Sequence, residues 1–336
     1  MKKIKFSYLK TTLLLGLVFS LTVSCERNLS DEVEFASFPA IGEVFIDAPI
    51  GLGGNFYFPY GGSKATAWTV DGEVSYKGTA SMRFDVPNAN DPEGNYAGAI
   101  FRIDGVGSGR DLTGFDALTF WAKASQTVTI GEIGFGEDFL ENKYVASRIN
   151  VSLTTNWVKY VIPIPDPSKL IQERGMLRYS AGGIGPVGIE VGYTFWIDEL
   201  KFEKLGTIAQ LQPVILNGED IEEQSFTGSN INIASQGLSQ TFNVNGKNLM
   251  VYSAPAYFTF SSSDTDVAIV NEDGIVTIIG EGTAEITALL AGVAATGSLK
   301  VTSSGILPFA PVPTKPSVDV KSIYSDTYTA ETESNF

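Results

Sequence analysis

The sequence predicts an all-β protein made of β-sandwiches, on the basis of three observations. Short runs rich in Val, Ile, Thr, Phe and Tyr recur along the chain, and several alternate apolar with polar residues, the period of a half-buried strand. The 35 glycines supply turns between such runs, and no segment shows a four-turn amphipathic helical pattern. With 336 residues, 43% of them hydrophobic, the chain is long and apolar enough for two or three folded domains.

Net charge and missing residue types exclude several functions. The formal net charge is −15 and no basic stripe follows residue 10, so we expect no nucleic acid as a partner. The same charge repels acidic polymers at long range and favours a neutral ligand. The chain has no His and one Cys, which excludes Ser-His-Asp and Cys-His nucleophiles, the usual zinc ligands and an internal disulfide.

Residues 1–24 predict a lipoprotein signal peptide. A start rich in lysine precedes the apolar stretch 13–23, which is too short to span a bilayer as a stable helix. Residues 21–25 (LTVSC) resemble a bacterial lipobox, whose cysteine is lipidated while the chain is cut just before it. The resemblance implies lipidation of Cys25 and attachment to a membrane. The alternative is an ordinary secretion signal with an incidental cysteine.

Residues 25–40 predict a polar tether. Its first residues, CERNLSDE, place acidic side chains close to the cysteine, which resembles the export signal of surface lipoproteins of the Bacteroidetes. The resemblance implies a protein that is exported, lipid-anchored to the outer membrane and exposed on the cell surface. Buried acyl chains contribute about 0.8 kcal/mol per methylene, so several of them give durable anchoring.

Residues 41–205 predict a jelly-roll β-sandwich. Six segments have the composition of strands, and several of them alternate apolar with polar residues. Antiparallel strands over a region of this length fit one jelly roll. The six segments are 44–46, 81–86, 99–103, 117–122, 157–162 and 194–197.

Three motifs of this region resemble those of carbohydrate-binding jelly rolls of the galactose-binding-like class. Residues 76–84 (YKGTASMRF) resemble the entry to a strand of that class, and residues 111–123 (DLTGFDALTFWAK) resemble a second of its strands. Residues 195–202 (FWIDELKF) resemble the closing strand. Because the three motifs occur in the order of the class, the resemblance implies a carbohydrate-binding domain, although it does not identify the sugar.

Residues 208–303 resemble the bacterial Ig-like domain of group 2. The resemblance is carried by 260–270 (FSSSDTDVAIV), 273–277 (DGIVT) and 280–288 (GEGTAEITA). Within it, the Asp-Gly pair at the start of the second segment favours a turn, because glycine permits a positive φ. The resemblance implies an Ig-like β-sandwich as the second module.

Two segments follow this module. Residues 304–317 contain four prolines and predict a semi-extended linker. Residues 318–336 resemble the opening strand of a further jelly-roll module, which would make the chain a fragment of a longer protein. The alternative is a C-terminal tail, since so short a segment buries no core of its own.

We predict no catalytic residues. Glu132, Glu137, Asp138 and Glu141 form an acidic cluster, but their spacing lacks the E-x-D-x-x-E strand motif of family 16 β-glucanases. Glycosidases need two carboxylates across the scissile bond, and we expect these four residues to be solvated loop acids instead. No glycine-rich phosphate loop precedes a helix, so nucleotide binding is not supported.

The candidate sugar contacts are aromatic rings in loops. The C–H face of a pyranose packs on flat rings, while polar side chains bind its hydroxyl groups. Residues 55–62 (NFYFPYGG) place four rings in a glycine-rich loop, and the alternative for each single ring is burial between the sheets. Arg178 is a further candidate. The predicted ligand contacts are Phe56, Tyr57, Phe58, Tyr60, Trp68, Tyr96, Arg148 and Tyr179.

The same resemblance implies a structural calcium ion near the first and last strands of the jelly roll. Asp198 and Asp47, or Glu43 in place of the latter, would supply the hard oxygen ligands, together with backbone carbonyls near Lys77. The double acid of the class is Asp198-Glu199 in this chain. The alternative is that the aspartate caps a strand or pairs with a lysine.

These features lead to three hypotheses. The first is a non-catalytic glycan-binding lipoprotein of the cell surface that captures a neutral polysaccharide for partner hydrolases and a TonB-dependent importer, as in polysaccharide utilisation; a β-glucan is suggested by family analogy alone. The second is the N-terminal accessory region of a larger glycoside hydrolase. The third is a structural or adhesive stalk.

Overall fold

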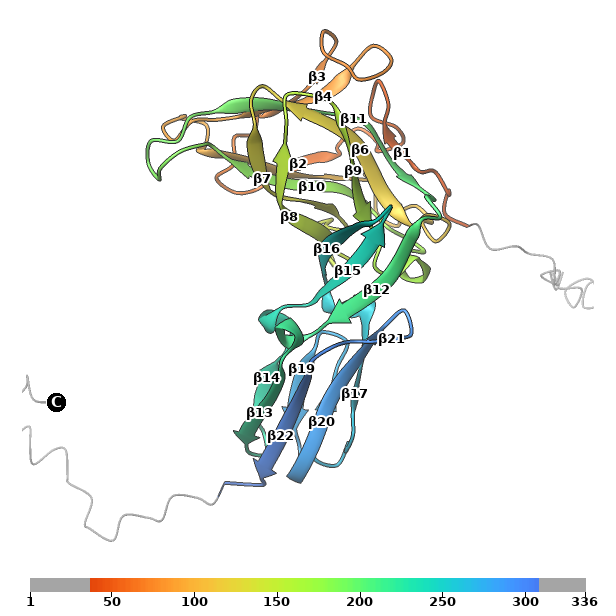
Figure 1. Ribbon diagram of the computed structural model, residues 1–336, viewed down its shortest axis with the longest axis vertical. Helices are drawn as coiled ribbons and strands as arrows, with labels where there is room; N and C mark the ends of the chain where they lie inside the picture. The colour runs from red at the N-terminus through yellow and green to blue at the C-terminus, as the bar shows by residue number, and fades with distance from the viewer. Residues whose placement is uncertain (1–36, 308–336) are drawn as a thin grey trace, which may run out of the picture. The chain divides into compact units, whose positions relative to one another are not determined.

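The computed structural model describes residues 37–307, whose regular structure consists of strands and short turns of 3-10 helix (Figure 1). The predicted all-β class is therefore confirmed. Within this range no helix is long and apolar enough to cross a membrane. The 3-10 turns are η1 (Pro167–Lys169), η2 (Leu216–Gly218), η3 (Ala234–Gln236) and η4 (Pro255–Tyr257).

Several predictions fall outside the described residues. They are the signal peptide 1–24, the lipidation of Cys25, the tether up to residue 36, the linker from residue 308 and the segment 318–336.

A six-stranded antiparallel sheet forms the first layer of the jelly roll. Its strands run in the order β3-β4-β11-β6-β9, and β1 pairs with β11. Alternation sets the inner face: on β4, Met82, Phe84 and Val86 are buried, whereas Arg83 and Asp85 are half-exposed. The strands are β1 (Glu43–Phe45), β3 (Trp68–Asp71), β4 (Ser81–Val86), β6 (Ala117–Ala124), β9 (Val158–Pro163) and β11 (Tyr193–Glu203).

An eight-stranded sheet forms the second layer, in the order β12-β15-β16-β8-β7-β10-β5-β2. All six predicted strand segments are found, five in the first layer and one, β5, in this layer. The five jelly-roll strands of the sheet are β2 (Tyr57–Pro59), β5 (Tyr96–Arg102), β7 (Val128–Phe135), β8 (Ala146–Leu153) and β10 (Gly175–Gly182).

Three further strands of this sheet come from the region predicted as the second module. Tyr252 and Ser253 on β16 pair with Ser147 and Ala146 on β8, so one hydrogen-bonded sheet continues from the first module into the second. The three strands are β12 (Ile208–Val214), β15 (Ser239–Val244) and β16 (Lys247–Ser253).

Aromatic rings fill the space between the two layers of the jelly roll. Phe84 and Phe195 stack with ring centroids 4.6 Å apart, and Tyr179 lies edge-on to Phe84 at 4.7 Å. All three side chains are at most 1% exposed. Full burial of a large apolar side chain contributes about 1.5–3 kcal/mol, so this cluster is a main source of the stability of the sandwich.

The remaining strands form two smaller sheets, in the orders β13-β22-β20-β17 (with β21 beside β20) and β14-β19-β18. β20 alternates with Ala284, Ile286, Ala288 and Leu290 buried. The predicted Asp-Gly turn joins β18 to β19, and Gly274 has a φ of +71° there. The strands are β13 (Asp220–Ser225), β14 (Asn230–Asn232), β17 (Phe258–Ser262), β18 (Ala268–Val270), β19 (Ile275–Ile278), β20 (Glu281–Leu290), β21 (Val293–Ala294) and β22 (Ser298–Ser304).

Candidate functional site

The candidate site lies on the outer face of the eight-stranded sheet, which points away from the sandwich core. Alternate residues of a strand point to opposite faces, and on β5 Ala97, Ala99 and Phe101 belong to the core cluster. Gly98 and Ile100 therefore point outward. Because directly paired residues of antiparallel strands share a face, the register identifies the other outward residues.

Two registered rows of residues cross this outer face, which we call the Arg178 face after the residue at its centre. Each row takes one residue from each neighbouring strand, and several of these are glycine or serine. Gly98, Ile100, Gly134 and Ser147 are buried, so the exposed part of the face is formed by the larger side chains around them. The first row is Phe58, Ile100, Arg178, Gly134 and Ser147. The second row is Gly98, Ser180, Glu132 and Ile149.

A network of ion pairs and hydrogen bonds is centred on Arg178. Its Nη1 pairs with Glu132, and its Nε lies 2.6 Å from Oε2 of Glu137. Two hydroxyl groups donate to the same carboxylates: Tyr60 Oη to Glu137 at 2.7 Å, and Ser147 Oγ to Glu132 at 2.6 Å. The network thus links the end of β2 to β8 across the sheet.

Burial and charge oppose each other at the centre of the Arg178 face. Burial disfavours the charged guanidinium, but the neighbouring tyrosine and carboxylates outweigh this effect, so the pKa of Arg178 is raised. Burial also raises the pKa of Tyr60, whose hydroxyl remains a neutral donor. A permanent cation between two carboxylates gives the cluster one net negative charge.

The structure corrects the expectation that the acidic cluster is solvated. The side chains of Glu132 and Glu137 are only 29% and 15% exposed, because both pair with Arg178. Asp138 is 13% exposed; it pairs with Arg174 and accepts the backbone N–H of Leu140 in its own loop. Of the four acids, Glu141 alone is exposed as expected.

Three of the predicted ligand contacts lie on or beside the Arg178 face. Tyr60 and Tyr96 lie above Gly98: a Cβ atom there would approach the two rings to 2.9 and 3.0 Å. Phe139, from the β7–β8 loop, lies 5.7 Å from the Tyr60 ring. Phe58 begins the first row, and the guanidinium carbon of Arg102 lies 4.0 Å from the centroid of its ring. The face therefore combines aromatic rings with fixed charged groups.

Three other predicted rings lie on the core side and are partly buried there, which corrects their prediction as ligand contacts. Phe56, Tyr57 and Trp68 pack against the core cluster. The Tyr57 and Trp68 rings each lie within 5.4 Å of the buried Phe101 ring. Tyr57 is the partner of Phe101 in the β2–β5 register, whereas Phe58 is the partner of outward Ile100. The adjacent residues Tyr57 and Phe58 on β2 therefore point to opposite faces of the sheet.

The predictions for Tyr179 and Arg148 are also corrected. Tyr179 is 1% exposed and belongs to the core, one position along β10 from outward Arg178. Arg148 pairs with buried Ile133, and its Nη1 donates to the carbonyl of Val161 on β9 at 3.2 Å. Its side chain is therefore directed toward the opposite layer and away from the Arg178 face.

The predicted calcium ligands meet at one loop, residues 76–80, but they act there as hydrogen-bond acceptors. Asp47 accepts two backbone N–H groups of this loop and Asp198 accepts two others. These hydrogen bonds lower the pKa of Asp47, while burial raises that of Asp198. Since the oxygens face N–H donors, the two residues as arranged do not fit a calcium site. Over residues 37–307 no three Asp, Glu, His or Cys side chains cluster suitably for a metal.

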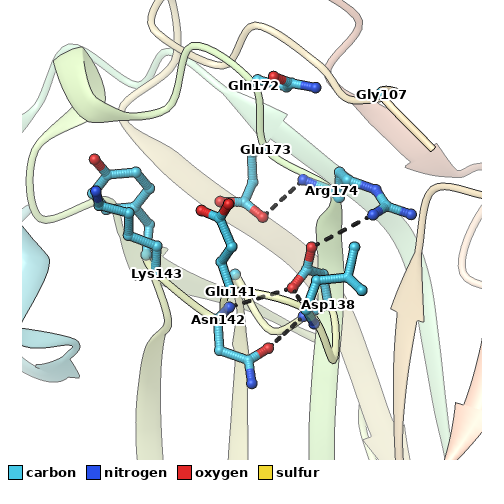
Figure 2. Close-up of a pocket in the computed structure, with 11 residues that line it drawn as sticks. Gly107, Asp138, Glu141, Asn142, Lys143, Gln172, Glu173 and Arg174 are labelled. Carbon is cyan, nitrogen blue, oxygen red and sulfur yellow. Dashed lines mark hydrogen bonds and ion pairs between the residues drawn. The ribbon is translucent and has the colours of Figure 1, made fainter.

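A cavity of about 240 Å³ lies beside the β7–β8 loop (Figure 2). Its lining includes Glu173, whose carboxylate accepts the backbone N–H groups of Arg174 and Gly175 at 2.8 and 2.7 Å. Burial raises the pKa of Glu173 to about 7. The cavity has one aromatic lining residue, Tyr144, so it lacks the several rings that mark the Arg178 face.

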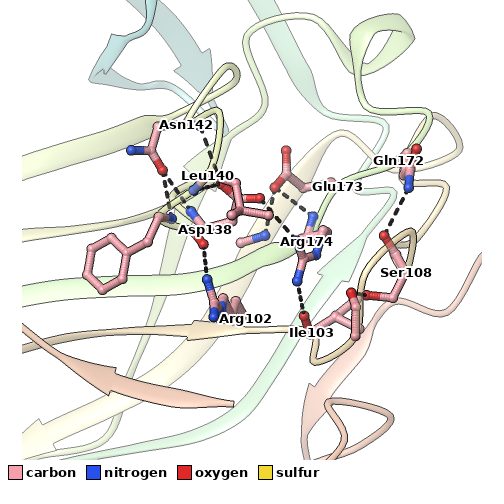
Figure 3. Close-up of polar contacts among 12 residues, drawn as sticks. Arg102, Ile103, Ser108, Asp138, Leu140, Asn142, Gln172, Glu173 and Arg174 are labelled. Atoms are coloured by element: carbon pink, nitrogen blue, oxygen red, sulfur yellow. Dashed lines mark hydrogen bonds and ion pairs between the residues drawn. The ribbon is translucent and has the colours of Figure 1, made fainter. Parts of the chain in front are cut away.

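Polar contacts around this cavity fasten the β7–β8 loop to β5 (Figure 3). Arg102 Nη1 donates to the carbonyl of Asp138 at 2.5 Å, and Asn142 Oδ1 accepts the backbone N–H of Asp138 at 3.0 Å. Arg174 Nη2 donates to the carbonyl of Ile103 at 2.9 Å. These contacts hold the loop that supplies Glu137 to the Arg178 face, so the cavity residues have a structural role.

Part of this chain is similar to known carbohydrate-binding modules. A family model described as "Carbohydrate binding domain 30" matches residues 53–234. A crystal structure of a family 30 carbohydrate-binding module is 17% identical, covers 48% of this chain and 87% of that chain, and has a TM-score of 0.35. The family 30 module of a cellulosomal cellulase of Clostridium thermocellum is also 17% identical, with coverage of 50% and 95% and a TM-score of 0.30.

A larger enzyme also has structural similarity to this chain. It is a β-1,2-glucanase from Parabacteroides distasonis, 11% identical, with 81% of this chain and 40% of that chain covered and a TM-score of 0.33. No curated protein matches the chain. The family match contains every residue of both rows of the Arg178 face and extends over more than half of the sequence. The chain therefore belongs to the carbohydrate binding domain 30 family.

Proposed function

We propose that this chain is a non-catalytic glycan-binding protein, which captures a neutral polysaccharide on the Arg178 face. The observation that carries the proposal is the combination, on one sheet face, of the Tyr60 and Tyr96 rings with the fixed network of Arg178, Glu132 and Glu137. Flat rings and preorganised polar groups are the two components that a sugar-binding surface needs.

The network leaves hydrogen-bonding capacity for sugar hydroxyl groups. Arg178 has five N–H donors, and the contacts with Glu132 and Glu137 engage its Nη1 and Nε, so donors on Nη2 remain. Each carboxylate can accept further hydrogen bonds, since an ionised carboxylate has about four acceptor positions. Because the ion pairs already fix these side chains, ligand binding orders few new rotamers, which favours affinity.

Charge supports a neutral ligand. The Arg178 network carries one net negative charge, and the whole chain has a formal net charge of −15. A sulfated or carboxylated polysaccharide would be repelled both at the site and at long range. A neutral glucan, including a β-glucan, meets no such repulsion.

The acids of the Arg178 face are better suited to binding than to hydrolysis. A glycosidase places two carboxyl groups on opposite sides of the scissile bond, one of them protonated. Here Glu132 and Glu137 are both paired with the same guanidinium, which lies between them. In this proposal the captured glycan is passed to partner hydrolases and an importer at the outer membrane, where lipidation of Cys25 anchors the chain.

The test is the affinity of the purified full chain for a panel of neutral and acidic polysaccharides, measured by affinity electrophoresis and calorimetry. We expect binding to at least one neutral glycan and none to the acidic ones. Tyr60→Ala should weaken that binding at least tenfold, while the matched control Glu141→Ala, an exposed acid on the β7–β8 loop, should leave it unchanged. A folded protein that binds no neutral glycan would contradict the proposal.

A further inference from the structure

The Arg178 face does not end with the jelly roll, because its sheet continues into the second module. Ser147 on β8 closes the first row, and its direct partner on the next strand is Tyr252 on β16. The next partner, on β15, is Ser239. A single row of register partners therefore runs from β2 to β15.

Two observations place Tyr252 on the outer side of the sheet. Its partner Ser147 points outward, since the Ser147 hydroxyl donates to Glu132 of the Arg178 network, and paired residues share a face. The adjacent Val251 is 0% exposed and pairs with Gln240, also 0% exposed, so the opposite side of β16 is buried. Met250, on the same side as Tyr252, is 50% exposed.

Direct contacts fix the place of Tyr252 relative to Arg178. Ala254 N donates to the carbonyl of Val145 at 2.8 Å, just beyond the β8–β16 pairing. The Tyr257 hydroxyl donates to the carbonyl of Tyr144 at 3.0 Å, and the two rings lie 5.3 Å apart. The β8–β16 pairing and these contacts fix the position of β16, and thus of Tyr252, relative to the jelly roll.

The resulting row is long compared with one sugar. Five steps between neighbouring strands separate Phe58 on β2 from Tyr252 on β16, and at about 4.8 Å per step this is about 24 Å. Along the row, Phe58, Arg178 and Tyr252 are partly exposed, whereas the Ile100, Gly134 and Ser147 side chains between them are buried. The two rings and the arginine are therefore the parts of the row that a ligand can contact. A surface of this length suits several consecutive residues of an extended chain.

We infer that the second module extends the glycan-binding surface: Tyr252 is a contact for the far end of an extended oligosaccharide that lies across the strands, with Ser239 beside it for hydroxyl groups. The inference rests on the proposed function of the Arg178 face. It gives the second module a part in binding and specifies the ligand as an internal stretch of a linear neutral chain, several residues long.

The test uses the full chain and a ladder of neutral β-linked gluco-oligosaccharides from disaccharide to octasaccharide, with dissociation constants from calorimetry. We expect affinity to rise with length until the chain reaches Tyr252. Tyr252→Ala should weaken binding of the longest oligosaccharides about tenfold and leave the shortest unchanged. Tyr252→Phe should retain the wild-type profile, and Tyr252→Leu, which keeps apolar bulk without a flat ring, should behave like Tyr252→Ala.

The control is Ile269→Ala, which truncates an exposed residue on β18, outside the eight-stranded sheet. Circular dichroism and the thermal midpoint would show that each variant is folded. If Tyr252→Ala keeps the wild-type length dependence while Tyr60→Ala loses binding, this inference is wrong and the proposed function stands. If the wild type binds no glycan of the ladder or of the polysaccharide panel, both are wrong.

Discussion

The Arg178 face and the cavity beside Glu173 both contain buried or half-buried charges, but they use them differently. On the face, Arg178 is held between two side-chain carboxylates on rigid strands, with rings nearby and hydrogen-bonding capacity remaining. In the cavity, the Glu173 carboxylate is held by backbone N–H groups of its own loop, and the arginines bind backbone carbonyls. In our proposal only the first cluster binds a ligand, because rings and free donors accompany its charges there and not in the cavity.

The largest expected effect is a difference in the free energy of unfolding between variants of an inward and an outward ring. Tyr179→Ala removes a ring that is 1% exposed and leaves a cavity in the core, so we expect the free energy of unfolding to fall by about 3–5 kcal/mol. Phe58→Ala, on the outer face, should cost about 1 kcal/mol or less. Urea unfolding followed by fluorescence measures both. Equal losses for the two variants would contradict the assignment of the faces.

The next largest effect is the dependence of stability on pH, which tests the structural role of Glu173 in the cavity. Because burial raises the pKa of Glu173 to about 7 from an ordinary value of 4.5, the folded protein holds this proton more tightly than the unfolded chain does. The resulting stabilisation is complete below about pH 4.5 and is lost as the pH rises through 7, a change of about 3 kcal/mol. Urea unfolding at pH 5, 6 and 7.5 measures it.

Glu173→Gln is the matched variant for this titration. The amide oxygen can still accept the two backbone N–H groups but does not titrate, so the stability of the variant should vary less between pH 5 and 7.5. Glycan affinity should be unchanged, since the cavity is not the proposed site. A variant with the wild-type pH dependence, or with lost binding, would show that the two regions are not separate in function.

A smaller effect is expected at the floor of the Arg178 face. Gly98→Ala would place a methyl group within 3.0 Å of the Tyr60 and Tyr96 rings, so both rings have to move. We expect affinity for the neutral glycan to fall about fivefold with a modest loss of thermal stability. Gly61→Ala is the control, because a Cβ atom there meets nothing within 4 Å. Unchanged affinity in Gly98→Ala would remove these two rings from the binding surface.

Alternation along single strands made much of the fold predictable. The segment 81–86 was predicted as a strand with its exact bounds, because Met82, Phe84 and Val86 alternate with polar residues. Along 56–60 almost every residue is aromatic, so neither alternation nor composition shows which side chains point into the core. Only the pairing of β2 with β5 decides that Tyr57 points inward and Phe58 outward.

The charged part of the site could not be predicted from a linear motif. Glu137 and Arg178 are 41 residues apart in sequence and meet because β10 lies beside β7. The prediction that Glu132 and Glu137 are solvated followed the general behaviour of acidic clusters and missed their arginine partner. Glu132 and Gly134 occupy alternate positions of β7, and no residue pattern there identifies Arg178 as the partner of the acid.

The pairing of β16 with β8 was equally hidden. The resemblance of residues 208–303 to an Ig-like domain predicted a separate second sandwich, and that identity stays a prediction. A strand joins another sheet wherever an edge has unpaired N–H and C=O groups, and no residue pattern in β16 specifies β8 as its partner. Three-dimensional register was needed to see that Tyr252 continues the row of Arg178.

The most direct measurement of the central claim is the affinity of Arg178→Met for the neutral glycan that the wild type binds. Methionine keeps the apolar stem and removes the guanidinium, so we predict a dissociation constant about tenfold to a hundredfold larger, corresponding to about 1.4–2.8 kcal/mol. The thermal midpoint and the circular dichroism spectrum would establish that the variant is folded. A folded Arg178→Met protein with wild-type affinity would contradict the claim that the Arg178 face binds the glycan.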